Sequence, residues 1–217
     1  NIAHQWRQPL SELGIYMYKL KKFFASREKE SFEETYEDSK RVIKKMSQTI
    51  DDFRNFFNTN KPKEIFLVNS VIEDALMMLK GTLKNEHIQV RVTAEDKVEV
   101  FGYKSELTQV LINLLTNAKD AFVDKDSKNR FIDIHVARFD GQTLAITVRD
   151  NAGGIKPEIL DKVFEPYFST KQPSLGTGLG LYMSKMIIEN SMHGRIEVCN
   201  AGDGACFDIK VPIKFEE

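Results

Sequence analysis

The first sixty residues carry a narrow apolar seam that repeats at helical spacing. Apart from Ser39, apolar side chains recur at alternating intervals of four and three residues in two runs, namely Trp6, Leu10, Leu13, Met17, Leu20 and Phe24, then Tyr36, Ser39, Ile43, Met46, Ile50, Phe53 and Phe57. This spacing predicts two helices with one apolar stripe each. The polar stretch 26–30 between them predicts an antiparallel helical hairpin. Two such helices bury too little surface to make a core alone. The seam therefore predicts a homodimer in which two hairpins form a four-helix bundle.

The hydrophobic periodicity changes after residue 60, which marks a second domain. The segment 58–64 is polar and contains Pro62, so we expect a linker there. Beyond it the pattern predicts strands at 65–68, 87–92, 97–101, 132–136, 144–148, 196–198 and 207–211, and helices at 70–84, 104–123 and 179–192. Asn69 or Ser70 is the expected cap of the first of these helices. The mixture predicts an α+β chain, with a helical domain at 1–60 and an α/β sandwich at 61–217, whose mixed sheet has helices on one face.

Composition excludes several classes of protein. The 31 Lys and Arg residues nearly balance the 32 Asp and Glu residues, which argues against binding nucleic acid by phosphate neutralisation. No apolar run approaches the ~20 residues of a membrane-spanning helix, so no membrane contact is expected in this chain. Because it begins with Asn1, we expect a fragment whose upstream part is absent. Cys199 and Cys206 fit neither a metal-ligand spacing nor a disulfide framework, which suits a reducing cytosol. We expect both to be small apolar strand residues, and we leave open that they face each other across a turn.

Three segments of the second domain carry residues suited to binding phosphate and a cation. Asp150–Ile155 follows a predicted strand, Gly176–Leu181 opens a predicted helix, and Asn113 and Asn117 share one helical face. Glycines at a helix start let phosphate approach backbone N–H groups. A carboxylate at a strand end can accept a hydrogen bond from an exocyclic amine such as that of adenine, and amide oxygens suit Mg²⁺. Each signal alone is weak, but their combination indicates a nucleotide site.

Five segments, in order, resemble the conserved boxes of a bacterial sensor histidine kinase transmitter region. They are the phosphoacceptor box at 3–10, the N box at 113–118, the first glycine box at 150–155, the F box at 164–171 and the second glycine box at 176–181. The resemblance covers essentially the whole chain. His4 followed by Gln8, Pro9 and Leu10, together with the segment 117–121, resembles the nitrogen-regulation-like subgroup.

This resemblance implies a two-part kinase. The helical hairpin would be the dimerisation and histidine phosphotransfer domain, and the sandwich a Bergerat-type ATP-binding domain. ATP would phosphorylate His4, and the phosphoryl group would pass to an aspartate of a response regulator docked near Tyr16, Tyr18 and the Phe23–Phe24 pair. A place in the bundle core is the better interpretation for Phe24 and is left open for the other three. Gln8, one turn after His4, is a candidate for positioning water when the regulator is dephosphorylated. The resemblance implies a cytoplasmic portion, with inner-membrane anchoring of the full-length protein left open.

Site residues follow by resemblance. Asp150 would accept the adenine amine, with Gly153 and Gly154 shaping the floor beneath the base. Asn117 would coordinate Mg²⁺, and Asn113 would support the phosphates and metal. Lys171 could reach a phosphate or remain a solvated lysine. The lid over the triphosphate would consist of Gly176, Thr177, Gly178, Leu179 and Gly180, anchored by Phe164 and Phe168.

Several positions depart from the family pattern. Gln5 replaces the acidic residue that usually follows the phosphoacceptor; it can orient the imidazole but cannot take its proton. Asp120 stands where a basic residue is common, which leaves Lys119 or Lys171 to neutralise phosphate, and Ala152 stands where glycine is common. Two alternatives remain open: an ATP-binding dimeric scaffold with weak or no autokinase activity, favoured by Gln5, and a gyrase-like ATPase, disfavoured because the amide of Asn113 is a poor general base.

Two further expectations concern the helix of the phosphoacceptor and the remaining histidines. Pro9 removes a backbone hydrogen bond, so we expect the helix to bend just after His4. His87 and His135 are expected to be ordinary residues in strands, and His193 is expected to lie beside a turn glycine.

Overall fold

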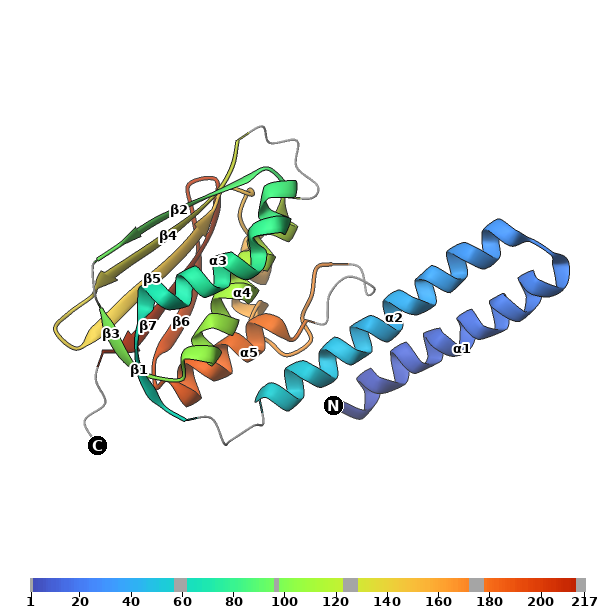
Figure 1. The fold of residues 1–217 in the computed structure, drawn as a ribbon, viewed down its shortest axis with the longest axis horizontal. Helices are drawn as coiled ribbons and strands as arrows, with labels where there is room; N and C mark the ends of the chain where they lie inside the picture. Colours follow the sequence, from blue (N-terminus) through green and yellow to red (C-terminus); the bar gives the residue numbers. More distant parts are fainter. Residues whose placement is uncertain (1, 57–61, 96–97, 123–128, 172–177, 214–217) are drawn as a thin grey trace. The chain divides into compact units, whose positions relative to one another are not determined.

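A computed structural model describes residues 2–56, 62–95, 98–122, 129–171 and 178–213 (Figure 1). The chain divides into two compact units, residues 1–59 with 169–177 and residues 60–168 with 178–217. Among the described residues, none of the helices combines the length and the apolar character that crossing a membrane requires.

The first unit is a helical hairpin, as the apolar seam predicts. Helix α1 (Ile2–Ser26) and helix α2 (Lys29–Phe56) run antiparallel (Figure 1). Only Arg27 and Glu28 lie between them, so the turn is shorter than the polar stretch in the sequence suggested. The N–H of Glu28 donates to the carbonyl of Phe23 at 3.1 Å. The rings of Phe24 and Phe32 lie 6.4 Å apart across this turn.

Among the described residues, the predicted seam alternates between exposed and half-buried positions, and the half-buried ones are Leu13, Leu20, Ser39 and Met46. Val42 and Thr35, which lie beside seam positions rather than in the seam, are buried. In contrast, Met17 is 70% exposed and Phe24 is 77% exposed. Five exposed apolar positions recur every seven residues, at Leu10, Met17 and Phe24 on α1 and at Tyr36 and Ile43 on α2, while Ile15 and Tyr18 are exposed outside this row. A row of this kind is the a-type or d-type face of a coiled coil that this single chain leaves uncovered.

The second unit contains a five-stranded mixed sheet. Its strands are β2 (Ile88–Ala94), β4 (Arg130–Arg138), β5 (Thr143–Asp150), β6 (Arg195–Ala201) and β7 (Gly204–Pro212), in the order β2-β4-β5-β7-β6. Strands β2 and β4 are parallel, and the other neighbours are antiparallel. A separate antiparallel pair joins β1 (Glu64–Leu67) to β3 (Glu99–Gly102).

The core lies between the sheet and one layer of helices. Helices α3 (Val68–Asn85), α4 (Lys104–Ala121) and α5 (Gly180–Met186) cover the same face of the sheet (Figure 1). Because side chains alternate along a strand, every second residue faces these helices. The buried rows are Ile132, Ile134 and Val136 on β4, Leu144, Ile146 and Val148 on β5, and Phe207, Ile209 and Val211 on β7. This confirms the α+β class and the one-sided helix layer.

Several local expectations were wrong. Helix α3 begins at Val68 with Leu67 as its cap, and no side chain caps it. The expected cap Ser70 lies within the first turn, where its Oγ donates to the carbonyl of Leu67 at 2.7 Å. The chain enters the helix directly from β1, because the N–H of Val68 is held by the carbonyl of Val98 at 3.1 Å.

The last helix and one histidine also differ from expectation. The predicted helix 179–192 divides into α5 and the π-helical turn η2 (Ile187–Ser191), closed by the N–H of Met192 on the carbonyl of Ile187 at 3.0 Å. A short 3₁₀ helix, η1 (Pro157–Lys162), was not predicted. His87 lies in the turn before β2 with φ +54°, not in a strand.

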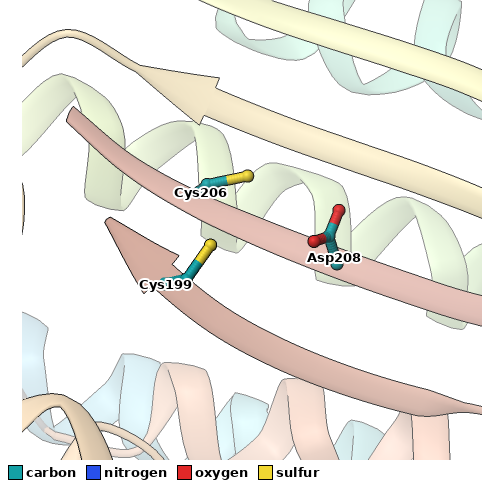
Figure 2. A group of neighbouring side chains, drawn as sticks. All are labelled: Cys199, Cys206 and Asp208. Atoms are coloured by element: carbon teal, nitrogen blue, oxygen red, sulfur yellow. The ribbon is translucent and has the colours of Figure 1, made fainter. Parts of the chain in front are cut away.

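The two cysteines face each other across the β6–β7 hairpin, the pairing that the sequence left open. Cys199 and Cys206 are register partners (Figure 2), and both thiols are free. Both cysteines lie in strands, as expected; Cys199 is exposed and Cys206 is buried. Burial, with smaller contributions from the neighbouring Asp208 and Cys199, raises the pKa of the Cys206 thiol to about 12.

Candidate functional site

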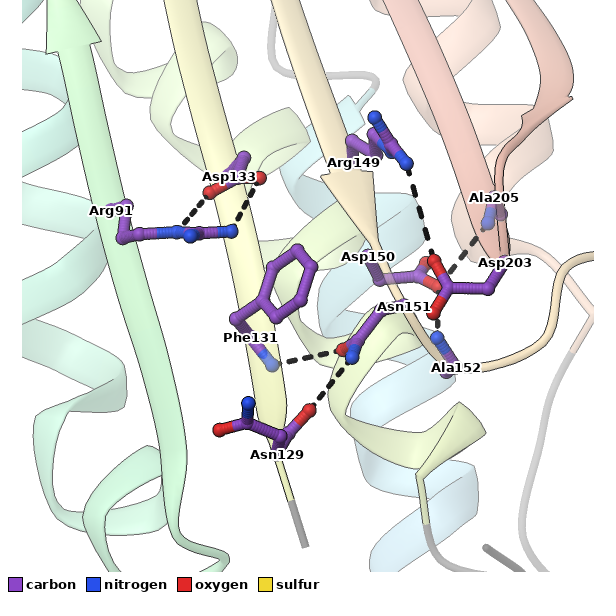
Figure 3. A network of polar contacts seen from close by, with 10 residues as sticks. All are labelled: Arg91, Asn129, Phe131, Asp133, Arg149, Asp150, Asn151, Ala152, Asp203 and Ala205. Carbon is purple, nitrogen blue, oxygen red and sulfur yellow. Dashed lines mark hydrogen bonds and ion pairs between the residues drawn. The ribbon is translucent and has the colours of Figure 1, made fainter. Parts of the chain in front are cut away.

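Asp150 ends strand β5 with its side chain on the helix-facing side of the sheet. It continues the buried row of Ile146 and Val148, and it is itself 5% exposed. Its Oδ1 accepts the N–H of Ala152 at 2.8 Å and the N–H of Ala205 at 3.2 Å (Figure 3). These two donors come from the loop after β5 and from the start of β7. The fold therefore holds a buried, oriented carboxylate at one end of the sheet.

The loop after Asp150 is anchored at its first residue by an asparagine side chain. The Oδ1 of Asn151 accepts the N–H of Phe131 at 2.9 Å, and its Nδ2 donates to the carbonyl of Asn129 at 2.7 Å (Figure 3). Phe131 lies at the start of β4 and Asn129 directly precedes that strand. The loop thus leaves β5 in a direction set by its neighbouring strand.

The glycines of the same loop are held by the β6–β7 hairpin. The N–H of Gly153 donates to the carbonyl of Asp203 at 2.6 Å. Asn200 clamps the end of the loop, since its Oδ1 accepts the N–H of Ile155 at 2.8 Å and its Nδ2 donates to the carbonyl of Ile155 at 2.7 Å. Gly154 has φ +71°, and a Cβ there would lie 2.7 Å from the Oδ1 of Asn200. Only glycine fits that backbone against this clamp.

Asn113 connects α4 to α5. Its Nδ2 donates to the Oγ of Ser184 at 2.9 Å, and Ser184 is buried. A Cβ at Gly180 would collide with the amide oxygen of Asn113, so the glycine lets the start of α5 approach α4 closely. The amide therefore fixes the position of the helix that follows the second glycine box.

Asn117 lies one turn further along α4 and is half-buried. Lys119 and Asp120 follow it as an ion pair, with side chains 23% and 24% exposed. The acidic residue that replaces the family's usual basic residue is therefore neutralised by its own neighbour.

The F box approaches the end of the second glycine box through backbone contacts. The N–H of Tyr167 donates to the carbonyl of Gly178 at 2.7 Å. Tyr167 has φ +73° and Gly178 has φ +66°. A Cβ at Gly178 would overlap the backbone of Tyr167, so a side chain is excluded there.

An aromatic contact ties the F box to the core. The ring of Phe164 meets that of Phe207 edge-on, with centroids 6.4 Å apart, and the Nζ of Lys185 lies 5.5 Å from the centre of the Phe164 ring. Leu179 is buried just before α5. Lys171 is half-buried, and its N–H donates to the Oγ of Ser169 at 3.2 Å. Gly176 and Thr177 lie outside the described residues.

The predicted phosphoacceptor His4 and its two predicted helpers occupy the beginning of α1. His4, Gln5 and Gln8 lie in its first two turns, and Pro9 lies within the helix. They belong to the first unit, whereas Asp150, Asn113 and Asn117 belong to the second.

Sequence reasoning missed four residues that build the second unit's site. These residues hold other parts of the site in place. The loop after β5 is positioned by Asn151 and Asn200. Helix α5 is positioned by Ser184, and the carboxylate of Asp150 by Ala205. Asn151 directly follows Asp150 within the first glycine box, but the motif assigns it no role. Asn200 and Ser184 act on partners far away in sequence, so no local pattern identifies them.

Comparison with known proteins agrees with this arrangement. Residues 102–214 match the family described as histidine kinase-, DNA gyrase B-, and HSP90-like ATPase. The chain is 30% identical over 218 residues to the two-component sensor PprA of Pseudomonas aeruginosa, covering 98% of this chain and 24% of PprA. It is 31% identical over 218 residues to the sensor histidine kinase ZraS of Salmonella typhimurium, covering 98% of this chain and 44% of ZraS. The chain thus spans less than half the length of these relatives.

Solved structures of histidine kinase ThkA share the fold. Its catalytic domain superposes with a TM-score of 0.61 at 26% identity, covering 70% of this chain and 95% of that domain. ThkA in complex with response regulator protein TrrA superposes with a TM-score of 0.70 at 21% identity, covering 98% of this chain and 60% of that one. The second likeness, at its lower identity, concerns the fold alone.

Proposed function

The chain belongs to the histidine kinase-, DNA gyrase B- and HSP90-like ATPase family, on its bacterial sensor histidine kinase branch, and from that premise we propose that it phosphorylates His4 with ATP and transfers the phosphoryl group to an aspartate of a response regulator. The observation that carries the proposal is Asp150, a buried carboxylate at the edge of a glycine-bearing loop. Residues 1–60 act as the dimerisation and phosphotransfer domain, and residues 61–217 as the ATP-binding domain.

Asp150 recognises the adenine of ATP. Two backbone N–H groups fix its Oδ1, so the carboxylate has one orientation in which to accept the exocyclic amine. Gly153 and Gly154 form the floor beneath the base because the clamp by Asn200 holds that loop in place. Ala152, at the position where glycine is common, is compatible with this role, since it is 3% exposed and contributes its N–H to Asp150.

Asn117 is the residue suited to hold Mg²⁺. It is half-buried on α4, one turn after Asn113, and its amide oxygen is a hard ligand of the kind Mg²⁺ accepts alongside phosphate oxygens and water. When bound, Mg²⁺ supplies the positive charge that offsets the phosphates during transfer. The Lys119–Asp120 pair beside it adds no net charge, which favours Lys171 over Lys119 as a basic residue for a phosphate.

Residues 176–180 form the lid over the triphosphate. Its described end is held by the contact between Gly178 and Tyr167 and by the close approach of Gly180 to Asn113. The edge-on contact of Phe164 with Phe207 anchors the F box that precedes the lid. Phe168 is assigned the same anchoring role by resemblance.

The phosphoryl group reaches the neutral imidazole of His4 rather than water. The unperturbed pKa of histidine lies near 6.5, so much of a solvated imidazole is unprotonated at pH 7. Asn113 holds the place of the water-activating glutamate of gyrase-like relatives, and an amide is a poor base. Its Nδ2 is engaged by Ser184 at 2.9 Å, which supports a positioning role. Gln5 orients the imidazole of His4.

Two hairpins associate as a homodimer through the exposed heptad row. Met17 and Phe24 on α1, with Tyr36 and Ile43 on α2, are apolar and exposed in the single chain. A second copy of the same row covers them in a four-helix bundle, an arrangement that the spacing of seven residues favours.

A response regulator docks on the hairpin. Tyr18 is 72% exposed on α1 and offers an aromatic contact that the bundle seam does not use. The complex of ThkA with TrrA supports a partner of this class. Gln8, one helical turn after His4, positions water when the phosphorylated regulator is hydrolysed.

Incubation with radiolabelled ATP and Mg²⁺ tests the proposal. A phosphohistidine is labile in acid and stable in base, and His4→Ala removes the label. The replacement of the usual acidic residue by Gln5 favours a second candidate, an ATP-binding dimeric scaffold. Tight ATP binding with no label on the wild type would support the scaffold and contradict the kinase. Steady ATP turnover without phosphoprotein would support a gyrase-like ATPase instead.

A further inference from the structure

Cys199, Cys206 and Asp208 cluster on the face of the sheet opposite the helices. Phe207 and Ile209 point into the core, so the alternating residues Cys206 and Asp208 point the other way along β7. Cys199 on β6 is the register partner of Cys206. The two Sγ atoms and a carboxylate oxygen of Asp208 all lie within 4.8 Å of one another (Figure 2).

We propose that Cys199, Cys206 and Asp208 form a binding site for a divalent cation of the zinc class. Thiolate sulfur and carboxylate oxygen are both ligands of Zn²⁺, at ~2.3 Å and ~2.0–2.2 Å. An ion at the centre of a triangle with 4.8 Å edges is about 2.8 Å from each corner, so small side-chain adjustments bring all three atoms into bonding range. Water completes the tetrahedron from the open side of the sheet, where Cys199 is exposed.

A hydroxyl already orients the carboxylate. The Oγ1 of Thr147 on β5 donates to the Oδ1 of Asp208 at 2.6 Å, and the two residues are register partners. Ligating carboxylates are characteristically held by such an outer hydrogen bond. Arg149, the register partner of Cys206 on β5, adds a nearby positive charge that partly balances two thiolates and a carboxylate around one dication.

The surroundings suit a cation better than a disulfide. A disulfide between Cys199 and Cys206 would use neither Asp208 nor the hydroxyl of Thr147. A neighbouring carboxylate disfavours the thiolates that disulfide exchange and zinc ligation both require. A bound dication reverses this effect, because its charge stabilises the thiolates and the carboxylate together and the thiol protons are released to solvent on binding. The cluster has the third ligand and the outer hydrogen bond that a metal site needs.

A cation at this site would cross-link the two strands of the β6–β7 hairpin, which supports the loop after Asp150. Cys199 precedes Asn200, which clamps Ile155, and Cys206 follows Ala205, which donates to Asp150. A cation bridging the two strands at this pair would restrain the segment 200–205 between them. The metal site is argued from its own geometry and does not depend on kinase activity.

Zinc titration of the untagged chain, kept reduced by a phosphine without oxygen, tests the site. Competition with a chromogenic chelator gives the affinity, and Co²⁺ substitution reports thiolate ligands as a sulfur-to-cobalt charge-transfer band. We expect one Zn²⁺ per chain at this site and this band in the wild type. Thr147→Val should weaken binding ~10–100-fold, as loss of an outer partner does, and Cys199→Ser and Asp208→Asn should weaken it further.

Glu197→Gln is the matched control. Glu197 is the register partner of Asp208 on the neighbouring strand, but its carboxylate is held by Arg195 at 2.6 Å. Zinc affinity should be unchanged in this variant, and Zn²⁺ should raise the melting temperatures of the variant and of the wild type equally. The proposal is overturned if the wild type binds no more tightly than Cys199→Ser, if the cobalt complex lacks the thiolate band, or if Asp208→Asn leaves the affinity unchanged.

Discussion

The substitution Asp150→Asn separates nucleotide recognition from folding. An asparagine fits the same volume, and its Oδ1 can still accept the N–H groups of Ala152 and Ala205. With that oxygen engaged, the second oxygen of the carboxylate becomes an NH₂ group. An acceptor thus becomes a donor at the position where the adenine amine, itself a donor, is expected.

The magnitude follows from the hydrogen bonds involved. A hydrogen bond to a charged group contributes ~1.5–3 kcal/mol, so its loss should raise the dissociation constant of ATP by about 10- to 150-fold. The two internal hydrogen bonds change from charge-assisted to neutral, which should lower the free energy of unfolding by ~1–3 kcal/mol. The variant should therefore fold and still bind ATP poorly.

Calorimetric titration with ATP and GTP provides the assay. Guanine presents an oxygen where adenine has its amine, so Asp150→Asn should shift the preference toward GTP as well as weaken ATP. Asp133→Asn is the matched control. Asp133 lies on neighbouring β4, and its carboxylate accepts hydrogen bonds from Arg91 at 2.5 and 2.8 Å (Figure 3). This ion pair is exposed to solvent and contributes ~0–1 kcal/mol, so its loss should leave ATP affinity unchanged. Wild-type ATP affinity and an unchanged ATP-to-GTP ratio in folded Asp150→Asn would refute the role of Asp150.

Three further predictions concern the hairpin, the regulator and the buried thiol. Met17→Glu should raise the dissociation constant of the dimer ~10²–10⁴-fold in sedimentation, because burying each of two symmetric Met17 side chains contributes ~1.5–3 kcal/mol. Lys22→Glu, at an exposed polar position, should leave that constant unchanged. An unaffected dimer in Met17→Glu would contradict the role of the seam. Gln8→Ala should slow regulator dephosphorylation while His4 is still phosphorylated, and a full dephosphorylation rate would exclude the role of Gln8. The pKa of the Cys206 thiol is raised from 9.0 to about 12 by the fold. Between pH 9 and pH 12 the folded chain therefore keeps a thiol proton that the unfolded chain has released. The stability that the neutral thiol contributes is present below pH 9 and is lost as the pH rises toward 12. Denaturant melts should show a smaller loss of stability over that range in Cys206→Ala, and equal slopes would argue against the shift.

Periodicity predicted the elements whose burial is one-sided. The rows on β4, β5 and β7 alternate because one face of each strand meets helices, and α4 shows its helical spacing for the same reason. Asp150 occupies the same parity as Ile146 and Val148, so its direction follows from the strand pattern too. The hairpin was likewise predictable, because its seam spans both helices.

Features set by tertiary contacts were not predictable. Asn200 clamps Ile155 and Ser184 binds Asn113 across long sequence separations, and nothing near either residue encodes its partner. Ser70 looked like a helix cap, but the bond from Val68 to Val98 starts the helix earlier. Packing likewise decides where α5 gives way to a π-helical turn.

The most direct test of the kinase assignment is to locate the phosphoryl group after a short incubation with ATP and Mg²⁺. Peptide mass spectrometry at neutral to alkaline pH preserves phosphohistidine. We expect modification of His4 in the wild type, a strong reduction in Asp150→Asn at ATP concentrations below saturation, and none in His4→Ala. A wild type that binds ATP and stays unmodified at His4, or that carries the group on another residue, would contradict the kinase assignment.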